Sequence, residues 1–195
     1  DRPPNRDLYL SHINGLPVGD SRAQGVVRGS RFYHADLGIT LAFPTGWIVD
    51  NQRSKVVAYT EAKDAVMTVS AEAPPPGMAP KEFLGRMLQG VTTTEAAPLQ
   101  VNSLDGYRAV VRSMTLPWGN QGPANVAVVY YNNLAYIFQG FTRQAAGLSS
   151  FEPVFLSSVK TFRRLKDNEF TAAEPDRIRV IQAGNQTNIE QLARK

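Results

Sequence analysis

Hydrophobic and polar residues alternate through much of the first half of the chain, a pattern typical of half-buried β-strands. Pro44 and Gly46 interrupt the alternation as a turn, and the three prolines at 74–76 end it because proline cannot donate to a central ladder. Five segments are therefore predicted as strands: 31–34, 37–43, 47–51, 55–61 and 65–73. Before them, residues 1–30 are rich in glycine and proline and predict an irregular arm, with a short helical turn around Leu8–His12.

The spacing changes to that of a helix at 80–91, where Phe83, Leu84, Met87 and Leu88 fall on one face. Four more strands are predicted after it, at 99–104, 107–116, 125–131 and 134–142. Asp105-Gly106 and Asn132-Asn133 are predicted as hairpin turns, and 117–124 as a longer connection.

A final helix is predicted at 149–165, with one hydrophobic stripe and a cationic last turn that suits the helix dipole. The stripe consists of Phe151, Val154, Phe155, Ser158, Val159 and Phe162, and the cations are Lys160, Arg163 and Arg164. The helices do not alternate with the strands, which favours an α+β fold over a doubly wound parallel sheet. We expect an antiparallel sheet of about seven to eight strands covered by two helices.

The expected organisation has four parts. Residues 1–30 form the arm, 31–166 the α+β domain, 167–176 a linker, and 177–195 a small βα appendage with a strand at 178–182 and a helix at 187–194. The chain begins with Asp1 and shows no signal-like segment, so we expect a processed product or a fragment of a longer protein.

Composition excludes several classes of site. The chain has 195 residues, no cysteine and only two histidines, so thiolate chemistry and an HExxH zinc site are excluded. Phosphate-loop, dinucleotide and GxSxG motifs are also missing, and we expect no enzyme activity, no catalytic residue and no metal or other cofactor in this chain. No hydrophobic run is long enough to span a membrane. The net charge of +4 resides at the two ends, which argues against nucleic-acid binding.

A stretch at 9–47 carries a resemblance to a known family. It is similar to a segment that follows the catalytic domain in one branch of bacterial HExxH zinc metalloproteases, the CAAX-protease-like family with its HtpX-like and BepA-like envelope proteases. Ala35 and Ile39 depart from the family pattern, and the LAFPTGW run is shortened. The matching residues are Tyr9, His12, Ile13, Gly15, Gly19, Asp20, Gln24, Gly25, Val27, Arg28, Gly29, Phe32, His34, Leu37, Gly38, Pro44 and Gly46.

Two further resemblances concern the rest of the chain. The tail at 177–195 is similar to the element that ends that branch, which itself resembles the start of a LysM module, although Asn185 and Gln186 stand where Gly-Asp-Thr is usual. The segment LGITLAFPTGW at 37–47 is similar to PsbP-like α+β domains.

The first resemblance implies a non-catalytic accessory or docking domain of a periplasmic or outer-membrane-associated zinc metalloendopeptidase. Zinc would belong to the missing catalytic domain, which would lie upstream and be the partner in cis, with envelope proteins or peptidoglycan as further candidates. The alternative is a free-standing PsbP-like binding module that uses an aromatic sheet face or the Trp118 loop. The candidate interface residues are His12, Asp20, Arg28, His34 and Trp118.

Three of these residues, His12, His34 and Trp118, also have a structural interpretation, as do the sheet aromatics. His12 and His34 would each cap a turn or bond a backbone carbonyl, which is favoured over a zinc site shared with Asp20 or Asp36. Trp118 either projects from its loop as a contact or folds back over the sheet edge. For the sheet aromatics, core packing is favoured over a stacking platform; they are Tyr107, Tyr130, Tyr131, Tyr136 and Phe138.

Overall fold

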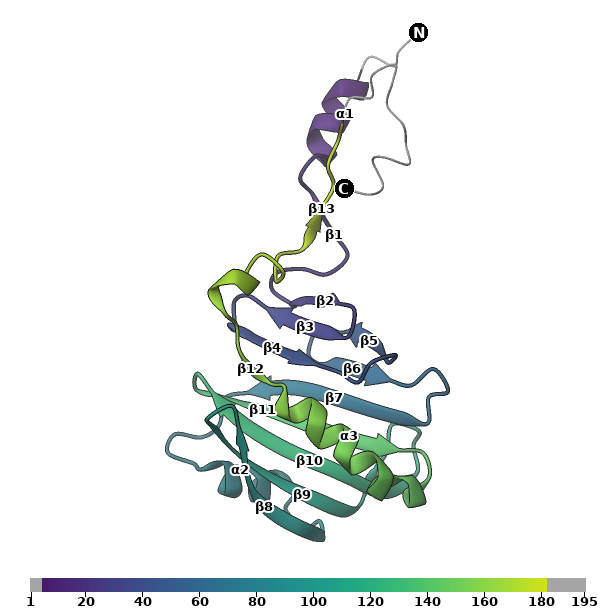
Figure 1. The fold of residues 1–195 in the computed structure, drawn as a ribbon, viewed down its shortest axis with the longest axis vertical. Coiled ribbons are helices and arrows are strands. Elements are labelled where there is room, and N and C mark those ends of the chain that lie inside the picture. Colours follow the sequence, from purple (N-terminus) through teal and green to yellow (C-terminus); the bar gives the residue numbers. More distant parts are fainter. Residues whose placement is uncertain (1–4, 182–195) are drawn as a thin grey trace.

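Seven antiparallel strands form the large sheet at the centre of the molecule (Figure 1). The structure is a computed structural model that describes residues 5–181. In spatial order the strands are β5 (Ile48–Asn51), β6 (Val56–Tyr59), β7 (Ala65–Glu72), β11 (Leu134–Thr142), β10 (Gln121–Tyr131), β9 (Leu104–Thr115) and β8 (Thr93–Val101). Together with the helices described below, this sheet confirms the predicted α+β class.

A second, small sheet packs beside the large one. Its four strands, in spatial order, are β12 (Arg163–Arg164), β4 (Ile39–Ala42), β3 (Arg31–His34) and β2 (Val26–Arg28). Phe32 pairs with Leu41, and both side chains belong to the same buried cluster as Met67 and Phe138 of the large sheet. The predicted strands thus divide between two sheets that share a core.

The two predicted helices cover opposite faces of the large sheet. Helix α2 (Pro80–Met87) buries Phe83 and Leu84 against Val126 and Val128 of β10, whereas α3 (Leu148–Lys160), which follows the 3₁₀ helix η1 (Ala145–Gly147), packs on the side of Ala127 and Val129. Successive side chains of a strand point to opposite faces. Strand β10 is therefore buried on both sides, which explains its nearly continuous hydrophobic run.

The predicted turn at Asp105-Gly106 is wrong. The hairpin between β8 and β9 turns at Asn102 and Ser103, which have φ values of 48° and 66°, and Gly106 lies within β9. A Cβ atom at Gly106 would lie 2.5 Å from the Val128 carbonyl oxygen. This glycine therefore serves the close approach of two strands and not a turn. The turn at Asn132-Asn133 is confirmed, with φ values of 51° and 60°.

The helix predicted at 149–165 ends earlier than expected. The side chain of Asn102 donates to the carbonyl oxygens of Lys160 and Phe162, at 3.0 and 2.9 Å, and the chain then enters β12. Arg163 and Arg164 therefore pair with β4 and do not compensate a helix dipole. Of the predicted stripe, Phe162 is buried between Tyr136 and Phe138, whereas Val154 is exposed. The helix predicted at 80–91 likewise stops early, at Met87.

The two ends of the described chain meet in a stalk that projects from the rest of the molecule, the body (Figure 1). We define the stalk as residues 5–18 and 176–181; it contains α1 (Arg6–Ile13), which confirms the predicted turn, β1 (Pro17–Val18) and β13 (Asp176–Arg177). The strand predicted at 178–182 is displaced, since residues 178–181 form no strand and β13 precedes them. The helix predicted at 187–194 lies outside the described residues.

Residues 163–175 connect the body to the stalk. This segment, which includes most of the expected linker, forms the 3₁₀ helix η2 (Asp167–Glu169) and buries Ala173 against Ala35 and Leu165. Arg163 and Glu169 form two hydrogen bonds of 2.7 and 2.6 Å across it. Within the part of the chain that the structure describes, no helix combines the length and hydrophobicity needed to cross a membrane.

The outer strands of the large sheet are irregular or short. The register of β8 against β9 shifts between Thr94 and Ala97, where Glu95 has a φ of 52°, and Pro98 lies within the same strand. Strand β5, at the opposite edge, has only four residues.

Candidate functional site

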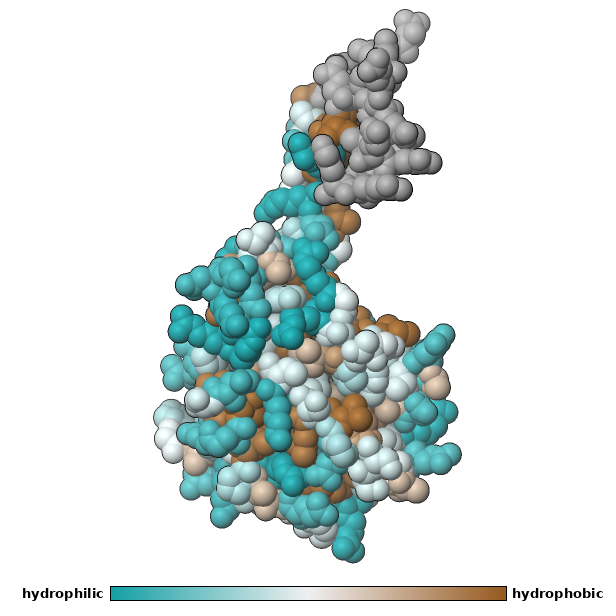
Figure 2. Space-filling view, viewed as in Figure 1, coloured by the Kyte–Doolittle hydropathy of each residue, from teal (hydrophilic) through white to brown (hydrophobic). Residues whose placement is uncertain are grey.

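Most of the large hydrophobic residues that are exposed in the described chain lie on the stalk. Among residues 5–181, eight large hydrophobic residues are exposed, and five of them lie on the stalk. These five are Leu8, Tyr9, Leu16, Val18 and Ile181, with exposed fractions between 45% and 64%. On the face shown in Figure 2, brown hydrophobic residues appear on the stalk, and many hydrophilic residues lie on the body near its base. A patch with this composition is typical of an interaction surface.

His12 lies on α1 within the stalk. Its Nδ1 atom is 2.7 Å from the carbonyl oxygen of Leu8, to which the ring donates, and the residue is exposed. The ring therefore bonds a backbone carbonyl of its own helix, as the structural interpretation predicts.

Asp20 and Arg28 make contacts near the base of the stalk, and Arg28 joins the stalk to the body through Asp176. Asp20 accepts hydrogen bonds from the Val27 amide at 2.7 Å and from the Asn51 side chain at 3.1 Å. Arg28, at the end of β2, donates to the Ala172 and Glu174 carbonyls and to the Asp176 carboxylate at 3.0 Å. The hydrogen bond with Asp176 raises the pKa of Arg28, and the same bond lowers the pKa of Asp176.

Arg22 adds a second tie between the arm and the connecting segment. Its guanidinium donates to Asp36 at 2.8 Å and also forms an ion pair with Glu174. These side chains are 40–53% exposed, so each pair contributes little to global stability. They connect the segment that follows β1 to the segment that precedes β13.

Trp118 lies apart from the other candidate residues, in the connection between β9 and β10. Its indole N–H donates to the Lys63 carbonyl at 3.0 Å, and the Arg143 guanidinium lies 5.4 Å from its ring centroid. The side chain is half-buried against Phe141 and its neighbours. It therefore folds back onto the sheet, as the structural interpretation predicts.

The aromatic side chains of the sheet do not form the exposed face that the alternative function would use. Tyr136 and Phe138 are 2% and 0% exposed and pack against Phe162. On the opposite face, Tyr130 meets Phe83 of α2 edge-on, at a centroid distance of 6.0 Å. These side chains consequently form core and not a surface platform, as the favoured interpretation predicts.

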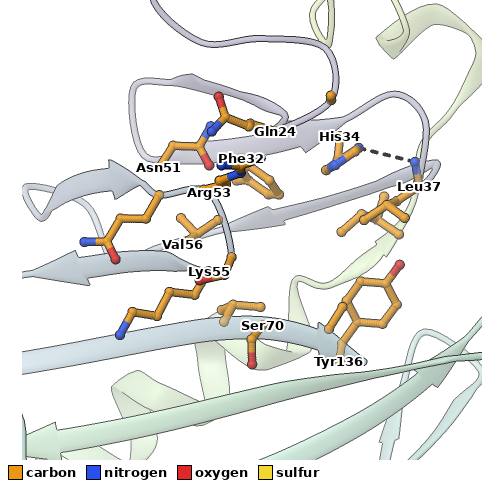
Figure 3. Close-up of a pocket in the computed structure, with 16 residues that line it drawn as sticks. Gln24, Phe32, His34, Leu37, Asn51, Arg53, Lys55, Val56, Ser70 and Tyr136 are labelled. Carbon is orange, nitrogen blue, oxygen red and sulfur yellow. Dashed lines mark hydrogen bonds between the residues drawn. The ribbon is translucent and has the colours of Figure 1, made fainter. Parts of the chain in front are cut away.

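His34 lies at one end of a pocket of about 310 Å³ between the small sheet and one end of the large sheet (Figure 3). Its Nδ1 accepts a hydrogen bond from the Leu37 amide at 3.3 Å. Burial lowers the pKa of His34, although Asp36 and a backbone hydrogen bond with Ala23 act in the opposite direction. The ring is therefore neutral at neutral pH and carries its proton on Nε2.

Two further residues border this pocket, Tyr136 and Asn51, and the Tyr136 hydroxyl and the Asn51 side-chain oxygen have no hydrogen-bond partner in the described part of the chain. Burial raises the pKa of Tyr136 to about 12, so the hydroxyl keeps its proton. In Figure 3 the Tyr136 hydroxyl points toward Leu37, and Gln24 and Asn51 lie at the opposite end. Arg53 and Lys55, in the turn between β5 and β6, complete that end.

The structure thus distributes the predicted residues over three places. His12 is on the stalk, Asp20 and Arg28 are at its base with His34 nearby in the small sheet, and Trp118 is on the large sheet. Within residues 5–181 no three His, Asp or Glu side chains are grouped so that they could hold a metal ion.

Sequence reasoning missed the pocket because its residues come from segments far apart in the chain. One signal was available: Tyr136 interrupts a hydrophobic strand, and a buried tyrosine usually needs a partner for its hydroxyl.

No protein-family model matches this sequence, and no curated protein matches it. Among solved structures, the chain is similar to the cyanobacterial PsbP protein CyanoP from Synechocystis, with 14% identity and a TM-score of 0.51, over 75% of this chain and 98% of that one. A protein from Bacteroides thetaiotaomicron also has a TM-score of 0.51, at 12% identity over 73% of this chain and 51% of that one. At these identities the likeness concerns the fold alone. The chain therefore has a PsbP-like α+β fold.

Proposed function

We propose that the chain is a non-catalytic binding module that docks onto a partner domain through its stalk. The observation that supports this proposal is the concentration of exposed hydrophobic side chains on α1, β1 and residue 181. Leu8 and Tyr9 are exposed, so their hydrophobic surface contributes stabilising free energy only when a second surface buries it. The ion pair between Arg28 and Asp176 joins β2 of the body to β13 of the stalk.

The partner we propose is a zinc endopeptidase domain encoded upstream in the same protein, in the periplasm or at the outer membrane. The family-like stretch at 9–47 begins within the stalk, so residues that carry the resemblance, such as Tyr9 and Ile13, lie in or beside the exposed patch. In the family, this segment follows the catalytic domain. The zinc and the hydrolytic chemistry would then belong to that domain, while the present chain positions substrates or limits access to the site.

The test combines a sequence observation with a binding measurement. The reading frame upstream should encode an HExxH motif, and the purified upstream domain should bind this chain in calorimetry. Replacing Leu8 and Tyr9 together with serine should weaken binding at least tenfold, whereas Val154→Ser, at an exposed position on α3, should not. A frame without HExxH, or no binding, would refute the protease partner; equal binding by the stalk variant would refute docking through the stalk.

A free-standing PsbP-like binding module is the second candidate. Its two expected surfaces are closed or folded back, but the pocket beside His34 and Tyr136 provides a different binding site. A signal peptide directly before Asp1, in place of a protease domain, would favour this candidate.

A further inference from the structure

We propose that the pocket between His34 and Lys55 binds a small hydroxy acid, with an apolar body between a hydroxyl group and a carboxylate. The hydroxyl would meet Tyr136 at the inner end, and the carboxylate would lie at the cationic mouth formed by Arg53 and Lys55. This site is independent of the stalk and of any partner that the stalk binds.

The hydroxyl of Tyr136, at the inner end of the pocket, lacks among residues 5–181 the hydrogen-bond partner that a buried hydroxyl requires. Tyr136 is only 2% exposed, yet its hydroxyl has no partner within the described residues. A buried polar group without a partner is costly, and native proteins rarely leave one unless a water or ligand completes it. A ligand hydroxyl could accept from Tyr136 or donate to it.

The mouth of the pocket favours an anion. Among residues 5–181, Arg53 and Lys55 border it and no aspartate or glutamate does, and neither cation belongs to an ion pair. Nearby, the Asn51 amide donates to Asp20 and Gly25 and leaves its oxygen without a partner.

The middle of the pocket is hydrophobic, and its size limits the ligand. Phe32, Ile39, Val56 and Val69 line it between the two polar ends. A volume of about 310 Å³ holds roughly ten water-sized groups at about 30 Å³ each. This size fits a ring or short chain with its carboxylate at the mouth, and lies at the small end of ligand pockets.

The probe we choose is 3-(4-hydroxyphenyl)propanoate, which has a hydroxyl and a carboxylate at opposite ends of an apolar body. Amide chemical shifts should move around Phe32, Leu37 and Val56, with saturation below about 1 mM. Two analogues isolate the polar ends: 3-phenylpropanoate lacks the hydroxyl, and 3-(4-hydroxyphenyl)propan-1-ol lacks the charge. Each should bind several-fold more weakly than the probe.

Variants of the protein provide the matched test. Tyr136→Phe should weaken binding of the probe about tenfold and leave binding of 3-phenylpropanoate unchanged. Without ligand, the variant should have the same melting temperature as the original protein or a higher one, because an unpartnered hydroxyl is removed. Tyr130→Phe is the control, since its hydroxyl is also buried without a partner but lies outside this pocket. Lys55→Gln should weaken binding of the two carboxylates and leave binding of the alcohol unchanged. Lys160→Gln should leave the binding of all three ligands unchanged.

Several results would overturn the proposal. They are no shift changes up to about 1 mM probe, equal affinity for the probe and for 3-phenylpropanoate, or unchanged binding by Tyr136→Phe or Lys55→Gln. A lower melting temperature for Tyr136→Phe without ligand, with probe binding intact, would show that the hydroxyl already has a partner such as a bound water.

Discussion

The body and the stalk are held together by different forces. In the body, β10 and β11 are buried on both faces, and α3 adds Phe151, Phe155 and Val159 to one continuous cluster. In the stalk, β1 and β13 pair through only two residues each, and the larger hydrophobic side chains face outward. The body can therefore fold by hydrophobic burial, whereas the order of the stalk depends on a few backbone hydrogen bonds and ion pairs at its base. This difference gives four predictions, from the largest expected effect to the smallest.

Removing one core aromatic should destabilise the body most. Phe155 is 1% exposed and packs so closely on β11 that a Cβ at Gly140 would lie 2.5 Å from its ring. Phe155→Ala should lower the free energy of unfolding by about 3–5 kcal/mol. Urea denaturation followed by tryptophan fluorescence measures this change, and a loss below about 1 kcal/mol would contradict the described core.

The connecting segment should show an intermediate, pH-dependent effect. The hydrogen bond from Arg163 lowers the pKa of Glu169 from 4.5 to about 2. A carboxyl whose pKa is lower in the folded state stabilises the protein above its unfolded pKa, and this contribution is lost as the pH falls from about 4.5 toward 2. Glu169→Gln should therefore cost about 2 kcal/mol at neutral pH.

The same substitution has an internal control in its pH profile. Urea denaturation of both proteins at several pH values should show the two stabilities converging in acid. A difference that stayed constant across this range would mean that the ion pair is not the source of the stability.

Removing the Arg28 contacts at the base of the stalk should affect only the stalk. Arg28→Ala removes the contacts to Ala172, Glu174 and Asp176, which are all close to the surface. Hydrogen exchange of the Gly15 and Ile178 amides, which bond across the stalk, should accelerate roughly three- to tenfold. Amides of β10 should exchange at their original rates, and Arg53→Ala serves as a control that leaves the stalk amides unchanged. Equal acceleration in β10 would show that body and stalk open as one unit.

Changing the exposed stalk residues should affect stability least. Leu8→Ser combined with Tyr9→Ser should shift the free energy of unfolding by no more than about 0.5 kcal/mol, because both side chains are already in solvent. Thermal unfolding of the two proteins measures the difference. A large loss would indicate that these residues contribute to the folded chain itself and not to a partner surface.

The strands and the amphipathic faces of the helices were predictable because each depends on local periodicity. The alternation in β3 and β4 gives their inward side chains, Phe32 and Leu41, but does not reveal that these strands form a separate sheet. Gly106 resembles a turn residue in sequence, and only the neighbouring β10 backbone shows why glycine is required there. Local patterns cannot report which distant backbone lies close.

The sequence could predict that certain polar residues make contacts, but not which of them lie together in a site. Asp20 and Arg28 are polar residues whose partners, Asn51 and Asp176, lie in other segments, so sequence reasoning located one side of each contact. Asn51 and Tyr136 border the same pocket although they are far apart in the chain and belong to no motif. Their role depends on missing hydrogen-bond partners, which only a three-dimensional arrangement can show.

The outer strands of the large sheet affect how the molecule behaves at high concentration. A long regular edge would offer free N–H and C=O groups to another chain and invite fibril-like aggregation. In β8 the register shift at Glu95 and the missing N–H of Pro98 break that row of groups, and β5 is too short to template a second chain. A peptide that binds by adding a strand would find no continuous ladder at either edge. Both edges of the large sheet are thus protected from association with another chain through strand pairing.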